Sequence, residues 1–183
     1  MSGVTDVVPV LSKNVQQTWL APNTATTTGG ATQFDFGTAV PANLQSLVQP
    51  DYPRNVVITL SGTESALSVT VSGIDARGRT VDETLVLTVA NTGPIGSVPF
   101  AVVTQIRINS QTGGSGGEHL DVGYGSKLGL MNNITASTDV YKALQDGTNI
   151  VVGSQTFDVV NGTVTFAASL NNTLNFELFY KAR

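Results

Sequence analysis

The segment Glu118-His119-Leu120-Asp121 holds the single histidine of the chain between two carboxylates. Successive side chains of a strand point to opposite faces, so His119 and Asp121 would share one face. Such a pair can contribute to a metal site or orient a general base. A zinc or transition-metal site needs a third protein ligand, which the neighbouring sequence does not offer. We therefore interpret both residues as ordinary strand residues.

The segment Gly123-Tyr124-Gly125-Ser126-Lys127 has glycines and a lysine, as phosphate-binding loops do. A P-loop requires two glycines separated by four residues, followed directly by lysine and then by serine or threonine. This segment lacks that spacing, and no helical pattern follows it to direct a positive N-terminus at a phosphate. We interpret it as a turn that ends a strand.

Arg77, Arg79 and Arg107 are the candidates for a basic site that binds carbohydrate, lipopolysaccharide or nucleic acid. No aromatic residues alternate with them for base stacking, and two arginines around Gly78 are typical of a solvated turn. A Ser-His-Asp relay would have to use His119, and no serine has the glycine-flanked surroundings of a nucleophile elbow. The sequence predicts a protein that is not an enzyme, with no catalytic, cofactor-binding or metal-binding residues.

Three segments match the acceptor pattern for N-glycosylation, beginning at Asn133, Asn161 and Asn171. The amino-terminal residues carry no basic group and no long apolar run, so we expect no secretory signal. Without secretion, these asparagines are most simply turn-forming residues.

Short runs of alternating apolar and polar residues predict strands, each with one buried and one exposed face. Between residues 54 and 130 the expected buried positions are Val56, Ile58, Leu60, Val69, Val71, Leu85, Leu87, Val89, Phe100, Val102, Ile106 and Ile108. In the last third they are Phe157, Val159, Val164, Phe166, Leu174, Phe176, Leu178 and Tyr180. Strands that recur about every 8–12 residues are typical of sandwiches and barrels. We expect an all-β fold, an antiparallel β-sandwich of the immunoglobulin-like or jelly-roll kind.

Turn residues separate these strands. Gly78 is the natural left-handed residue of a hairpin turn over residues 75–79, and Asn161-Gly162 is a strong hairpin signal for the carboxyl-terminal strands. Residues 111–117 are rich in glycine and predict a flexible loop. Residues 125–147 have no clear period, although Val140-Tyr141-Lys142-Ala143-Leu144 is compatible with a helical turn.

The first part of the chain has a different composition. Residues 1–53 combine a short apolar run at 7–11 with a stretch rich in threonine, alanine and glycine at 21–39. Such a stretch buries little and orders mainly by lying on something else. We predict an extended amino-terminal arm with short strands over residues 1–53 and one sandwich domain, including carboxyl-terminal hairpins, over residues 54–183.

Composition limits the classes of partner. The chain has 183 residues, enough for one good core, and only 12% of them are charged, against about 25% in typical domains. Its nine basic residues are scattered and the net charge is −4, which argues against nucleic acid as a partner. No apolar run is long enough for a membrane helix. The chain contains no cysteine, so it has no disulfides and no thiolate metal site.

Several apolar residues are expected on exposed faces. Val57, Val86 and Phe179 lie opposite to their buried strand neighbours, while Trp19 and Leu20 lie in the polar arm. Single exposed apolar residues are normal. Taken together with the arm, they are compatible with a subunit that is covered on both faces in an assembly.

Five segments occur in an order that resembles small β-rich, immunoglobulin-like structural proteins of tailed bacteriophage virions. They are residues 53–59 (PRNVVIT), 71–85 (VSGIDARGRTVDETL), 100–108 (FAVVTQIRI), 122–130 (VGYGSKLGL) and the closing hairpin within 161–182 (NGTVTF and NFELFYKA). The resemblance covers about residues 53–183 and consists mainly of strand and turn residues. The arm matches no known pattern.

This resemblance implies a non-enzymatic virion protein that is assembled in the host cytoplasm and attaches to other virion proteins. We favour a head decoration or cement subunit that binds the major capsid protein and associates with copies of itself, because the chain is short and lacks the repeats of a fibre. The alternatives are a neck or tail component, or an adhesin tip that binds a receptor or carbohydrate through residues 111–117 and 77–79. No cofactor, nucleic acid or membrane is expected as a partner.

Overall fold

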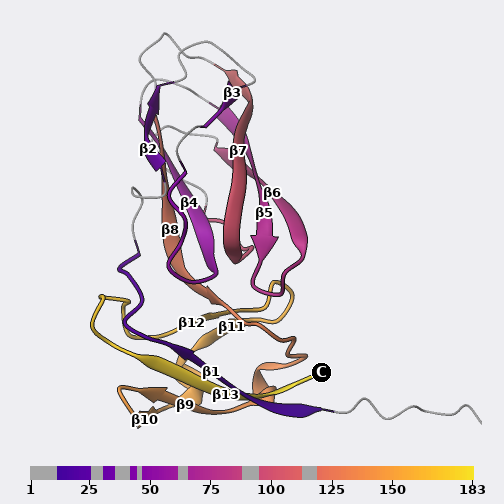
Figure 1. Ribbon diagram of the computed structural model, residues 1–183, viewed down its shortest axis with the longest axis vertical. Coiled ribbons are helices and arrows are strands. Elements are labelled where there is room, and N and C mark those ends of the chain that lie inside the picture. The colour runs from indigo at the N-terminus through magenta and orange to yellow at the C-terminus, as the bar shows by residue number, and fades with distance from the viewer. Residues whose placement is uncertain are drawn as a thin grey trace, which may run out of the picture.

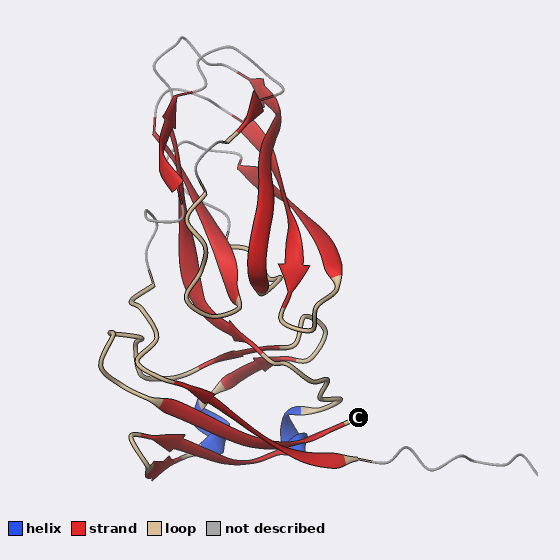
Figure 2. Cartoon of the chain, in the orientation of Figure 1, coloured by secondary structure: helices blue, strands red, loops and turns tan. Residues whose placement is uncertain are grey.

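Antiparallel strands form nearly all of the regular structure in a computed structural model of the chain, shown in Figures 1 and 2. The structure describes residues 12–25, 31–35, 42–44, 47–61, 66–87, 95–112 and 119–183. Its two helical segments in these ranges are three-residue 3-10 turns, η1 (Ser137–Asp139) and η2 (Val152–Ser154). The predicted all-β antiparallel sandwich is confirmed.

The larger sheet has the strand order β11-β12-β8-β4-β7-β5-β6, with β2 paired to β8 and β3 paired to β7. Its strands are β2 (Ala31–Asp35), β3 (Ala42–Asn43), β4 (Arg54–Ser61), β5 (Ala66–Asp75), β6 (Thr80–Leu87), β7 (Phe100–Thr112), β8 (His119–Gly129), β11 (Thr156–Asp158) and β12 (Thr163–Thr165). The sheet curls so that apolar side chains from its opposite parts meet inside. We call this cluster the first core; its fully buried members include Val56, Ile58, Val69, Val71, Ile106, Ile108, Leu120 and Val122.

The smaller sheet has the order β1-β13-β9-β10 and lies across one end of the larger sheet (Figure 1). Its strands are β1 (Lys13–Trp19), β9 (Val140–Gln145), β10 (Thr148–Ile150) and β13 (Phe176–Ala182). The β11–β12 hairpin lies between this sheet and the rest of the larger sheet. The side chains between hairpin and sheet form the second core, which includes Trp19, Leu128, Leu130, Val164, Phe166, Phe176, Leu178 and Tyr180.

The buried polar residue Gln17 fixes β1 in the second core. Its side chain donates a hydrogen bond to the Gly129 carbonyl at 2.8 Å and accepts bonds from the Met131 N–H at 3.1 Å and the Tyr180 hydroxyl at 3.0 Å. Buried polar groups are tolerated only when they are paired in this way. The register of β1 against β8 and β13 is therefore specified by hydrogen bonds as well as by Trp19.

Two cores replace the single core that the sequence predicts. Strand β8 belongs to both, because it pairs with β4 from His119 to Leu128 on one side and with β12 at Leu128 and Gly129 on the other. Trp19, expected to be exposed in a polar arm, is 1% exposed and packs edge-on against Phe166 with 5.7 Å between ring centroids. The division of the chain at residue 53 stays a prediction, although β1 of the expected arm is part of the second sheet.

Strand alternation is predicted well except where the pairing is irregular and at Val159, expected to be buried but 37% exposed because it lies in the turn between β11 and β12. The register of β5 against β7 shifts between Ser72 and Gly73. The shift reverses which side chains face inward, so that Val103 is 2% exposed while Val102, expected to be buried, is 40% exposed. A bulge of this kind inserts an extra residue that periodicity cannot show. Val89 and residues 113–117 lie outside the described residues.

Two local predictions are wrong. Residues 140–144 form strand β9 and not a helical turn, because Asp146 (φ 48°) and Gly147 (φ 76°) make a two-residue hairpin turn to β10. Residues 123–127 do not end a strand but continue β8 without interruption. Gly125 permits this, since a Cβ there would lie 2.4 Å from the Asn55 amide nitrogen. The hairpin turns at Gly78 (φ 78°) and Gly162 (φ 66°) are confirmed.

Candidate interaction surface

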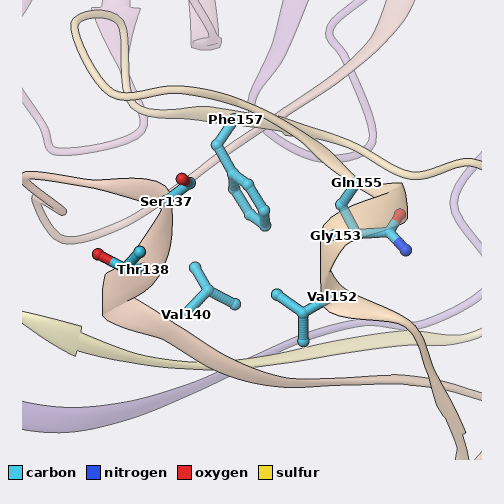
Figure 3. A pocket seen from close by; sticks show the side chains of 7 residues that line it. All are labelled: Ser137, Thr138, Val140, Val152, Gly153, Gln155 and Phe157. Carbon is cyan, nitrogen blue, oxygen red and sulfur yellow. The ribbon is translucent and has the colours of Figure 1, made fainter.

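A pocket of about 340 Å3 opens between the smaller sheet and the β11–β12 hairpin. It is lined by Ser137, Thr138, Val140, Val152, Gly153, Gln155 and Phe157. Figure 3 shows the Phe157 ring directed toward Val140 and Val152, with η1 and η2 forming the two side walls. Its volume is at the lower end of the range of small-ligand sites.

Local hydrogen bonds hold the two walls in place. At η1, the Asp139 carboxylate accepts bonds from the Thr135 N–H at 2.7 Å and the Ala136 N–H at 3.0 Å. These bonds, first of all the one from the Thr135 backbone, lower the pKa of Asp139. At η2, the Gln155 amide donates to the Val151 carbonyl at 3.2 Å, while its oxygen accepts from the Ala167 N–H at 2.9 Å. The pocket is therefore preformed.

The lining contains hydroxyls, one amide and apolar side chains, but no titratable group. A surface of this kind can bind an aliphatic side chain; it offers no general base and no nucleophile with an adjacent base. Val151, which precedes the lining residue Val152, is 75% exposed, and in the turn between β11 and β12 Val159 is 37% and Val160 is 82% exposed. Exposed apolar side chains beside an apolar pocket are typical of an interaction surface.

His119 and Asp121 both lie half-buried on β8, where they pair with Ser61 and Thr59 of β4. Within the ranges that the structure describes, no three His, Cys, Asp or Glu side chains gather as metal ligands would. The third neighbour, Glu118, lies outside those ranges. The structure thus places the pair in a strand, as predicted.

Lys127, the lysine of the segment compared with a phosphate-binding loop, contacts other parts of the protein. Its ammonium donates to the Gly96 carbonyl at 3.2 Å and lies 3.4 Å from the Ser97 hydroxyl, while its backbone N–H donates to Asn55. The lysine joins β8 to the segment that precedes β7.

Arg77 and Arg79 have different roles at the tip of the β5–β6 hairpin. Arg79 forms an ion pair of 2.7 Å with Asp75. Burial would raise the pKa of Asp75, but hydrogen bonds from Arg79 and from the Arg77 backbone outweigh it and lower that pKa. Arg107 lies on the exposed face of β7, in register with Thr70 of β5.

The prediction that Arg77 belongs to a solvated turn is wrong. Its guanidinium donates to the Asn133 side chain and, at 2.8 Å, to the Asn161 carbonyl. It is half-buried between the hairpin of the first core and two loops of the second core. Sequence periodicity does not reveal this role, because the partners are more than fifty residues away.

Of the three asparagines of the glycosylation pattern, Asn161 and Asn171 act in turns, whereas Asn133 makes a long-range contact. Asn133 accepts the hydrogen bond from Arg77, and the Asn161 side chain donates to Asp158 at 2.7 Å. The Asn171 oxygen accepts bonds from the Thr173 and Leu174 N–H groups, closing a local turn.

The outer face of the smaller sheet carries aromatic side chains. Tyr141 is 51% exposed and its ring centroid lies 6.5 Å from that of Phe179, which is half-buried as a residue of β13. The Lys142 ammonium lies 5.1 Å from the Phe179 ring centroid, a cation–π distance. Of the other residues expected to be exposed, Val86 is 58% and Leu20 is 64% exposed, whereas Val57 is half-buried.

Comparisons with known proteins add no relative: no family model, no curated protein and no solved structure matches the chain. Among the described residues, no helix has the length and hydrophobicity needed to cross a membrane.

Proposed function

We propose that the chain is a non-enzymatic structural protein of a tailed bacteriophage virion, most specifically a head decoration or cement subunit that binds the major capsid protein and associates with copies of itself. The sequence resemblance over residues 53–183 supports the virion assignment. The all-β fold agrees with that group of proteins.

One observation of the structure carries the proposal of a binding role: an uncharged pocket with exposed Val151 next to its lining residue Val152, and exposed Val159 and Val160 in the turn of the β11–β12 hairpin. A monomer gains nothing from exposing these side chains, whereas burial of apolar surface drives association. Repetition over a symmetric shell adds the weak contacts of many subunits.

Co-sedimentation of the purified protein with isolated empty heads, with tails and with host cells tests this function. We expect binding to heads that saturates at a fixed number of copies and raises the temperature at which the heads open. Binding to tails alone would assign a neck or tail role, and binding to cells alone an adhesin role; either result overturns the decoration assignment. His119→Ala tests whether the function needs the single histidine, and this variant is expected to bind heads as the unmodified protein does.

The adhesin alternative is favoured by a different surface. Exposed Tyr141 lies beside Phe179, and Gln16 and Glu177, which form a side-chain hydrogen bond of 2.8 Å, lie on the neighbouring strands. Aromatic rings flanked by amide and carboxylate groups can stack on a sugar and bind its hydroxyls. Tyr141→Ala would abolish cell binding if the adhesin role holds, and would leave head binding intact if the decoration role holds.

A further inference from the structure

The pocket between η1 and η2 is suited to one kind of occupant. Val140, Val152 and Phe157 provide an apolar interior, and Ser137 and Thr138 form one wall. Because no charged side chain lines it, an ionic or strongly polar ligand would lose its hydration without a paired charge in return. An aliphatic side chain on an extended segment fits this apolar and uncharged interior.

This chain contains such a segment. Residues 4–11 read Val-Thr-Asp-Val-Val-Pro-Val-Leu, in which five of eight residues are aliphatic and one is charged. Pro9 disfavours a helix in this segment and biases its neighbour toward extended backbone. The side chains have the size and chemistry that the pocket accepts.

The segment joins the described structure near the η1 wall. Lys13, the first residue of β1, pairs with Ala182 of β13. The next residue, Arg183, donates its backbone N–H to the Asn133 carbonyl at 3.2 Å, just before η1. The described part of the chain therefore begins at the margin of the sheet, on the side of the molecule where η1 supplies Ser137 and Thr138.

We propose that residues 4–11 of one copy bind in the η1–η2 pocket of a second copy. Val140 of the pocket pairs with Tyr180, which pairs with Val15, so the pocket lies inward of Lys13 along β1. An extended chain that continues outward from Lys13 would have to reverse to enter the pocket of its own copy. Eight extended residues reach about 27 Å, which is enough to bridge adjacent molecules. Each copy then donates one arm and receives one, an arrangement that closes either as a reciprocal dimer or, where the rotation between copies permits, as a ring. The inference rests on the self-association part of the proposed function and not on the capsid partner.

Cross-linking tests this exchange without background, because the natural chain has no cysteine. The variants Val8→Cys and Thr138→Cys are purified separately, mixed, and treated with a short bismaleimide. We expect cross-linked pairs that contain one molecule of each variant. The matched control pairs Val8→Cys with Thr84→Cys, an exposed position on β6 remote from the pocket, and is expected to give at least tenfold less product.

A pocket-filling variant separates specific binding from random collision. Gly153 lines the pocket, and a Cβ there meets no atom within 4 Å, so the fold accepts a side chain at this position. We expect Gly153→Leu to narrow the pocket from its wall and Gly153→Ala to leave most of it open. In the Thr138→Cys background, Gly153→Leu should reduce cross-linking at least tenfold and Gly153→Ala should leave it unchanged. Unchanged emission of Trp19 in each variant verifies that the second core is folded.

Three results would overturn the proposal: cross-linking that persists in Gly153→Leu, cross-linking no stronger than with Thr84→Cys, or cross-links formed only within single molecules of a Val8→Cys, Thr138→Cys double variant. Each of these results is measured in solution without phage particles. A negative cross-linking result would therefore not contradict head binding, and a failure to bind heads would not contradict arm exchange.

Discussion

Arg77 connects the tip of the β5–β6 hairpin to two loops of the second core, so its replacement by alanine measures how strongly the two cores stabilise one another. The guanidinium donates hydrogen bonds to the Asn133 side chain and to the Asn161 carbonyl, the latter at 2.8 Å. Hydrogen bonds from a charged donor contribute roughly 1–1.5 kcal/mol each when the donor is partly exposed. We expect Arg77→Ala to lower the free energy of unfolding by about 2–3 kcal/mol.

Gly162 provides the partner for a double-mutant cycle. Its φ is +66°, and a Cβ there would lie 2.0 Å from Nη2 of Arg77. Gly162→Ala therefore incurs about 1 kcal/mol of left-handed backbone strain and also displaces the guanidinium from both acceptors. Once Arg77 is alanine, only the backbone strain remains. The cycle should give a coupling energy of about 2 kcal/mol between the two positions.

Urea denaturation followed by the emission of Trp19, the single tryptophan, reports unfolding of the second core. Arg77→Lys keeps the charge but not the planar fork, and should fall between the unmodified protein and Arg77→Ala. Additive effects of Arg77→Ala and Gly162→Ala, or a loss below about 0.5 kcal/mol for Arg77→Ala, would refute this account of how the two cores are joined.

Two further predictions concern buried groups. Burial raises the pKa of Tyr124 to about 12, so the stability that its neutral hydroxyl contributes is complete below pH 10 and is lost as the pH rises toward 12. In an absorbance titration, Tyr124→Phe should reduce the ionisation near pH 12 by one tyrosine, and a transition of unchanged size there would contradict this. Gly125→Ala should destabilise the protein by about 2 kcal/mol, because its Cβ meets Asn55 inside the structure. Gly147 has φ +76° and no atom within 4 Å of a Cβ, so the control Gly147→Ala should lower the stability by only about 1 kcal/mol. Equal losses of stability for Gly125→Ala and Gly147→Ala in thermal denaturation would show that the Gly125 contact is not tight.

The sequence by itself determined the strands and most of their turns. The alternating residues Val56, Ile58 and Leu60 are all buried in the structure, because every second side chain of a strand points to the same face. Gly78 and Gly162 mark hairpins, since positive φ is costly for other residues. The Asp146-Gly147 turn was readable in the same way and would have identified β9 and β10.

Tertiary structure decided how these strands divide between two cores and where a pocket forms. Trp19 is buried because β1 pairs with β13, more than 150 residues later, and no local pattern encodes such a pairing. The exposure of Val102 follows from a register shift against β5. The pocket joins Ser137 and Thr138 of an aperiodic segment to Phe157 of a distant hairpin. Periodicity specifies which face of a strand is apolar, but long-range pairing specifies what that face meets.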